Sequence, residues 1–393
     1  MIFLLLACQG AEKHIEDLVF TTPSDDPAHY QVDTSILYDI ETSSPQWIIP
    51  GENLPVEITP AASNNNVDIH FFQDRLFIAW RSSPTHFAGD ETTMWIMSSA
   101  DQGATWEYET HIAMDADVRE PRFVSSEDML QFSYFEAGTN PAAFEPKQLW
   151  RIFRQAGQWS SPEVFGEEKS VLWDIKYRNG LFYMTTYDGG HYSADEPVYV
   201  RFWSSLDGID WSFVNGKEAV YVGGVSEVAF EFDSVGNLWA VGRNEDGDET
   251  GAGTQICFAP VQDLSAWECL QHSDPERYDS PEMFRHGDQI YLLGRIDRGG
   301  TFGPDGDLIS YSLRPKGFGL FRLNQDSFTL ELINELPGVG DTSFPSVRRV
   351  SENHFLFANY TSPLDDPDIS WFEAQMSSRG TQIYLMNLYF IPQ

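Results

Sequence analysis

A pair of short apolar runs decides the fold, because the chain repeats it. Val-Asp-Ile-His-Phe-Phe at residues 67–72 is followed by a turn and by Leu-Phe-Ile-Ala-Trp-Arg at 76–81. Runs of this length, rich in β-branched and aromatic residues and separated by a turn, predict two paired strands. The pattern begins again at residues 118, 173, 226, 281 and 343, so successive copies start 51 to 62 residues apart. This period fits one four-stranded blade of a β-propeller.

The six copies predict an all-β, six-bladed β-propeller over residues 46–393. Almost no helical periodicity interrupts the strands, and Gly, Asp, Asn and Pro mark the turns between them. The sixth copy offers only three clear strands, the last at 382–386. A ring without a free edge needs a fourth strand there, and Gln-Trp-Ile-Ile at 46–49 is the expected donor. One ring is therefore favoured over two domains.

The composition excludes several classes of function. The 393 residues include 60 acidic and 24 basic ones, which gives a formal charge of −36. Such a surface repels phosphate backbones and anionic headgroups, so we expect neither nucleic acid nor a bare membrane surface as a partner. Walker A, HExxH and GxSxG patterns are absent, and no Cys/His spacing is typical of zinc. We therefore expect no metal and no cofactor.

The first 45 residues predict an anchor and a tether. Residues 1–8 form a short apolar run that ends in Ala7 and Cys8, and this run resembles the lipobox of bacterial lipoproteins. Lipidation of Cys8 would make the protein an exported lipoprotein of the outer membrane or cell surface, with the lipid as its only membrane contact. The alternative is a buried N-terminal strand. Residues 9–45 are polar and irregular, as in a flexible tether.

Two cysteines remain, and the sequence leaves their state open. Cys257 and Cys269 lie on consecutive predicted strands. An oxidising compartment would permit a disulfide between them, and a reducing one would leave two buried thiols.

Equivalent positions in the six copies define a candidate site at the axis. The residues that end the second runs are Arg81, Tyr134, Tyr187, Arg243, Arg295 and Tyr360, and the carboxylates that open the first runs are Asp68, Glu120, Asp174, Glu227, Glu282 and Asp341. Equivalent positions share one level of a propeller, so we expect two neighbouring rings. Arginines bind a carboxylate through paired hydrogen bonds, and phenols and acids move protons. The alternative is a set of ion pairs that line a structural channel.

A local motif identifies the family that the chain resembles. Residues 99–106 match Ser-x-Asp-x-Gly-x-Thr-Trp, the Asp box, and residues 205–211 form a shorter variant. With Ala-Trp-Arg at 79–81 and Gly-Asp-Thr-Ser-Phe-Pro at 340–345, the chain resembles the sialidase superfamily of Asp-box (BNR-repeat) propellers over residues 46–393. It is most similar to a sialidase-like branch of bacterial lipoproteins.

The resemblance implies roles for individual residues. Sialidases bind the substrate carboxylate with three arginines, use a tyrosine assisted by a glutamate as nucleophile, and use an aspartate as acid and base. Carried over, this assigns carboxylate binding to Arg81, Arg243 and Arg295, polarisation of the nucleophile to Glu227, and proton transfer to Asp90.

Two departures from the family pattern change the expected chemistry. The family's Arg-Ile-Pro stands here as Ile-Thr-Pro at 58–60, and Phe344 occupies the position of the nucleophilic tyrosine. Arg119 is the candidate replacement for the missing arginine. The candidate replacements for the nucleophile are Tyr134, Tyr187 and Tyr360.

Three functions remain open at this stage. The first is a glycoside hydrolase that acts on glycans containing sialic or uronic acid. The second is a glycan-binding propeller without catalytic activity. The third is a uronate-directed polysaccharide lyase that uses His86 or His191 with a tyrosine. In each case we expect a monomer whose partner is an acidic glycan or oligosaccharide.

Overall fold

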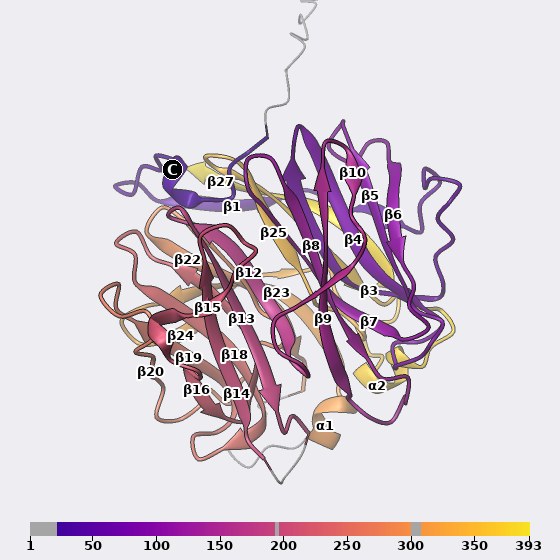
Figure 1. Cartoon of the computed structure of the whole chain (residues 1–393). Helices are drawn as coiled ribbons and strands as arrows, with labels where there is room; N and C mark the ends of the chain where they lie inside the picture. Colours follow the sequence, from indigo (N-terminus) through magenta and orange to yellow (C-terminus); the bar gives the residue numbers. More distant parts are fainter. Residues whose placement is uncertain (1–21, 193–195, 300–307) are drawn as a thin grey trace, which may run out of the picture.

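Six antiparallel sheets surround a common axis and form a closed six-bladed β-propeller (Figure 1). This computed structural model describes residues 22–192, 196–299 and 308–393. The first strands of neighbouring blades contact one another around the ring, so they line the axis. The predicted six-bladed, all-β architecture is confirmed.

The first three blades follow the chain from the axis outward. Blade 1 contains β3 (Ser63–Phe72), β4 (Arg75–Ser83), β5 (Thr93–Ser99) and β6 (Glu107–Ile112). Blade 2 contains β7 (Asp117–Ser125), β8 (Leu130–Ala137), β9 (Pro146–Gln155), β10 (Gln158–Trp159) and β11 (Glu163–Phe165). Blade 3 contains β12 (Val171–Arg178), β13 (Leu181–Gly189), β14 (Val198–Ser205), β15 (Ser212–Phe213) and β16 (Tyr221–Gly223).

The last three blades complete the ring. Blade 4 contains β17 (Val225–Phe232), β18 (Leu238–Asp248), β19 (Gly251–Ala259) and β20 (Glu268–Cys269). Blade 5 contains β21 (Glu282–His286), β22 (Gln289–Asp297), β23 (Lys316–Asn324) and β24 (Thr329–Leu336). Blade 6 contains β25 (Ser346–Ser351), β26 (His354–Thr361) and β27 (Gln382–Pro392).

The N-terminal part of the chain closes blade 6. The expected donor at residues 46–49 is β2 (Gln46–Ile49), which pairs with β27 as predicted. A second strand, β1 (Tyr38–Thr42), pairs with the remainder of β27, residues 388–392. The flexible tether predicted over residues 9–45 is therefore wrong at residues 38–42, which form β1, and Asp25 and Asp26 also contact the propeller, at Arg348 and at the backbone amide of Asn179. The predicted signal segment and Cys8 lie outside the described residues.

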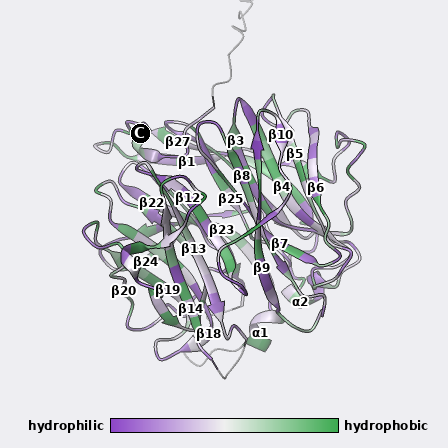
Figure 2. Cartoon of the chain, in the orientation of Figure 1, coloured by the Kyte–Doolittle hydropathy of each residue, from purple (hydrophilic) through white to green (hydrophobic). Residues whose placement is uncertain are grey.

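Apolar side chains hold neighbouring blades together. Alternate residues of a strand enter different apolar clusters, so both faces of a sheet are covered: Leu76, Ile78 and Trp80 of β4 join one cluster, and Phe77 and Ala79 join another. Figure 2 shows hydrophobic residues along the strands of the blades. Phe202 of blade 3 packs on Phe230 of blade 4, and Phe284 of blade 5 packs on Phe355 of blade 6. The inner strands β3 and β17 are buried along their whole length. A rigid wall therefore surrounds the axis.

A disulfide and an Asp-box turn stabilise the outer strands of the blades. Cys257 of β19 and Cys269 of β20 form a disulfide, which decides between the two alternatives left open by the sequence. In the Asp box, Asp101 accepts hydrogen bonds from the backbone amide and the hydroxyl of Thr105, each at 2.7 Å, so the motif stabilises a turn. The helices α1 (Leu308–Ser312) and α2 (Trp371–Gln375) are each one short turn, and in the described part of the chain no helix has the length and apolarity to cross a membrane.

Candidate functional site

Five blades each have one residue with a left-handed backbone conformation at an equivalent place, in the inner strand or just before it. Asn66, Glu120 and Glu227 lie in β-bulges of β3, β7 and β17, and Ser280 and Ser343 stand just before β21 and β25. Their φ angles lie between 49° and 75°, a region that L-residues other than glycine rarely adopt. A bulge turns a side chain out of its normal alternation. All five residues line one cavity on the axis.

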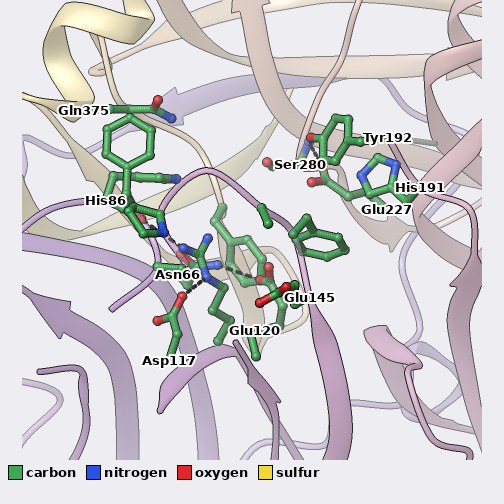
Figure 3. Close-up of a pocket in the computed structure, with 18 of the residues that line it drawn as sticks. Asn66, His86, Asp117, Glu120, Glu145, His191, Tyr192, Glu227, Ser280 and Gln375 are labelled. Carbon is green, nitrogen blue, oxygen red and sulfur yellow. Dashed lines mark hydrogen bonds and ion pairs between the residues drawn. The ribbon is translucent and has the colours of Figure 1, made fainter. Parts of the chain in front are cut away.

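The axial cavity has a volume of about 670 Å³. Residues 86–88, residues 141–145 and helix α2 contribute to its wall. Figure 3 shows His86 and Gln375 on one side of it and His191 and Tyr192 on the other. Cavities of several hundred Å³ accommodate small organic ligands, so this one has room for a sugar.

Two glutamates of the cavity differ in their partners. Glu120 is buried and accepts a hydrogen bond from the side-chain amide of Asn66 at 2.6 Å. Burial, and then the charge of Glu227, raise the pKa of Glu120 to about 7. Glu227 pairs with Arg243 at 2.8 Å and accepts a hydrogen bond from the backbone amide of Ser280 at 3.0 Å, and burial raises its pKa as well. Near neutral pH, Glu120 is therefore a proton donor and Glu227 is held beside a cation.

Two arginines, one from blade 1 and one from blade 2, share a single carboxylate of blade 2. Asp117 binds Arg81 at 2.8 Å and Arg119 at 2.5 Å, so the three groups carry one net positive charge. Arg81 is completely buried and also donates to the carbonyl of Phe87. Arg119 lines the cavity. The uncompensated charge is thus presented to a ligand by Arg119.

The other two cavity arginines are compensated by buried carboxylates. Arg243 lies between Glu227 and Glu245, at 2.8 and 2.9 Å. Arg295 lies 3.4 Å from Asp279 and donates to the backbone carbonyl of Thr342 at 2.8 Å. Both guanidinium groups are held in fixed orientations by these contacts.

A histidine and a tyrosine that line the cavity share another, fully buried carboxylate. The Nδ1 atom of His86 lies 2.8 Å from Asp341, and the hydroxyl of Tyr360 donates to the second oxygen of Asp341 at 3.1 Å. Burial lowers the pKa of His86, so the ring is neutral at pH 7. Burial and then the charge of Asp341 raise the pKa of Tyr360 well above its usual value, so the phenol keeps its proton. Arg119 also donates to the backbone carbonyl of His86 at 3.0 Å.

The structure brings most of the predicted site residues together. The predicted residues that line the cavity are His86, Arg119, Glu120, Tyr187, His191, Glu227, Arg243, Arg295 and Tyr360. Arg81 does not line the cavity but is buried and shares Asp117 with Arg119, as described above. Two others lie elsewhere: Tyr134 is buried in the apolar layer between blades 1 and 2, and Asp90 is exposed and does not line the cavity.

The predicted ring of six carboxylates divides into two levels, so the expectation of a single ring was wrong. Glu120 and Glu227 line the cavity, whereas Asp68, Asp174 and Glu282 do not. Asp68 binds Arg348 at 3.2 Å and Asp174 binds Lys176 at 2.5 Å, away from the cavity. Glu120 and Glu227 are themselves the bulge residues of β7 and β17, whereas Asp68 lies two residues beyond Asn66, the bulge residue of β3.

Several functional positions were not singled out from the sequence. Asn66, Asp117, Tyr192 and Ser280 line the cavity without having been named as candidates. Asn66 and Ser280 share with Glu120 and Glu227 a spacing of 53 or 54 residues, or a multiple of it, which was the available signal. Phe344 also lines the cavity, and its ring packs on Trp173 and under the guanidinium of Arg122. No group of three or more His, Cys, Asp or Glu in the described part of the chain is placed to hold a metal ion.

The architecture is that of a sialidase-like six-bladed β-propeller, as comparison with solved structures shows. A Trypanosoma rangeli sialidase is similar with a TM-score of 0.57 and 13% identity over 84% of this chain, which spans 55% of that protein. The phage phi92 endosialidase has a TM-score of 0.57 and 10% identity, covering 91% of this chain and 70% of the other. A protein of unknown function from Dyadobacter fermentans DSM 18053 has a TM-score of 0.62 and 12% identity, covering 89% and 99%. No protein-family model and no curated protein matches the sequence.

Proposed function

We propose that the protein is a glycoside hydrolase that cleaves acidic glycans in the axial cavity, with Glu120 as general acid. The observation that carries this proposal is the pair of buried glutamates, Glu120 and Glu227, which two β-bulges direct into one cavity beside Arg119. Paired carboxyl groups with different environments are the usual machinery of glycoside hydrolysis. The names of the similar structures, sialidase and endosialidase, also point to glycan chemistry.

Each group has a defined part in the reaction. Arg119, whose charge is uncompensated, binds the sugar carboxylate. Arg243 assists in binding the same carboxylate. Glu120 gives its proton to the glycosidic oxygen as the bond to the anomeric carbon breaks. A water molecule attacks that carbon and passes its proton to Glu227. Water is the nucleophile because Phe344 has no hydroxyl and both cavity phenols keep their protons. Burial and then the charge of Asp341 raise the pKa of Tyr360, and burial and then the charge of Glu227 raise that of Tyr187.

Release of methylumbelliferone from its sialosides and uronides tests this proposal. We expect Glu120→Gln and Glu227→Gln each to lower kcat at least about 100-fold, as loss of a general acid or base does. Glu127→Gln, at an exposed position remote from the cavity, is the matched control. Glycan binding without turnover of any acidic glycoside would instead establish a binding propeller.

A second candidate, uronate elimination, is favoured by the His86–Asp341–Tyr360 contacts. Here neutral His86 takes the proton at C5 of a uronate whose carboxylate Arg119 binds. The C4–O bond breaks, a C4–C5 double bond forms, and Tyr360 protonates the departing oxygen. The product absorbs in the ultraviolet, whereas hydrolysis yields no such chromophore. Elimination predicts that His86→Ala abolishes this absorbance and that Glu120→Gln leaves it largely intact.

We further propose that the protein is exported and lipidated on Cys8. The disulfide between Cys257 and Cys269 supports this, since disulfides persist in oxidising compartments. Metabolic labelling with a palmitate analogue tests it. Labelled protein in the membrane fraction that is lost in Cys8→Ala is expected, and unlabelled protein in the cytosol would contradict the proposal.

A further inference from the structure

We infer that a second sugar-binding subsite lies beside the axial cavity, between blades 2 and 3, so that the substrate is an oligosaccharide that spans both. The inference rests on the proposed function and extends it from a sugar to a chain of sugars. A second cavity of about 270 Å³ shares Phe144, Glu145, Tyr187 and His191 with the axial cavity. Two cavities with four lining residues in common adjoin each other.

The boundary between the cavities is aromatic. Phe144, half-buried in the loop between β8 and β9, meets the ring of His191 edge to face at 5.3 Å. His191 meets Tyr187 edge to face at 5.6 Å and stacks on Tyr192 at 3.8 Å. Aromatic rings offer apolar faces for the C–H groups of a pyranose, while their rigidity keeps the entropic cost of binding low. A glycan that crosses from one cavity to the next is thereby supported at the junction.

Charged groups of the second cavity are available for sugar hydroxyls. Lys169 is exposed and forms no ion pair with any residue of the described ranges, and the carboxylate of Glu145 likewise has no ion-pair partner there. Asp188, also in the wall, is neutralised by Arg201. An ammonium group donates hydrogen bonds and a carboxylate accepts them, so Lys169 and Glu145 together can bind the hydroxyls of one further sugar.

Binding measurements with sugars of increasing length test the subsite. Calorimetry on Glu120→Gln, which should bind without cleaving, would use α2,8-linked sialic acids and oligogalacturonates of one to four units. We expect the dimer or trimer of the preferred series to bind about tenfold more tightly than the monomer. Lys169→Ala should remove most of that gain and leave monomer binding unchanged. Lys147→Ala, a change to an exposed lysine outside both cavities, should alter neither.

The outcomes separate this inference from the proposed function. Affinity that is independent of length, or a Lys169→Ala effect that is equal for monomer and oligomer, would overturn the subsite and leave the axial site intact. Failure of every monomer and oligomer in both series to bind would overturn both. Because Lys169 has a left-handed backbone and alanine keeps the β-carbon, the substitution adds no new backbone strain.

Discussion

At the residue scale, the axial cavity depends on left-handed residues that are not glycine. Asn66, Glu120, Glu227, Ser280 and Ser343 each adopt a positive φ, at a cost of roughly 1 kcal/mol or more apiece. Glycine would relieve that cost but would place no side chain in the cavity. All five residues instead line the axial cavity. The packing of the rigid ring around the site therefore offsets the backbone strain of these five residues.

The raised pKa of Glu120 predicts a pH-dependent loss of stability. Its folded-state pKa is about 7 against an ordinary value of 4.5, so the folded protein holds a proton that the unfolded chain has released. The stabilising effect of that proton is complete below pH 4.5 and disappears as the pH rises through 7. We expect Glu120→Gln, which stays neutral, to gain up to about 3 kcal/mol over the wild type between pH 4 and pH 8.

Urea denaturation at several pH values measures this difference. Glu127→Gln serves as control because its side chain is exposed and its substitution should leave the pH dependence of the wild type unchanged. Parallel stability curves for the wild type and Glu120→Gln would contradict the assignment of Glu120 as the group that titrates near neutrality.

At the scale of single elements, β1 protects the outer edge of blade 6. Tyr38 and Ile40 are half-buried and the residues between and after them are exposed, so the strand has one weak apolar face. Such a short polar segment cannot be distinguished from a linker by its sequence alone. By contrast, β2 was predicted because the ring needed a closing strand and Trp47-Ile48-Ile49 is strongly apolar.

Removal of β1 should destabilise the protein and expose an edge. A chain that begins at residue 37 keeps β1, whereas one that begins at residue 44 lacks it. We expect the shorter chain to be less stable by about 2 kcal/mol, from lost burial of Tyr38 and Ile40, and to self-associate through the freed edge of β27. Thermal denaturation and light scattering measure both effects. Identical behaviour of the two chains would show that β1 is dispensable.

The disulfide should stabilise the outer edge of blade 4. Cys257 and Cys269 are 12 residues apart, and a loop of that size contributes about 2–3 kcal/mol when it is closed covalently. Cys257→Ser with Cys269→Ser should lose this amount in urea denaturation. Wild-type protein under reducing conditions should match the double variant. A double variant as stable as the oxidised wild type would contradict the prediction.

At the scale of the whole molecule, periodicity determined what the sequence could predict. The repeat gave six blades and placed Arg243, Arg295 and Tyr360 at the ends of equivalent strands, where they do line the cavity. It failed where the copies were aligned in the wrong register. Glu120 was placed in one ring with Asp68, although Glu120 is the bulge residue of β7 and Asp68 lies two residues beyond Asn66, the bulge residue of β3. Tyr134 is one residue out of register, because Phe135 pairs with Arg119 as Arg81 pairs with Asn65, and the side chain of Tyr134 therefore packs between blades.

The net charge of −36 predicts an unusual salt dependence for glycan capture. A polyanionic protein repels an acidic oligosaccharide over a Debye length, which falls from about 30 Å at 0.01 M salt to about 10 Å at 0.1 M. The contacts of Arg119 in the cavity are largely sheltered from that screening. We therefore expect the association rate of an acidic glycan to rise roughly two- to fivefold between low and physiological salt. A carboxyl-reduced, neutral analogue should show no such rise in stopped-flow fluorescence. An association rate that falls with salt would mean that a basic surface outside the cavity captures the glycan.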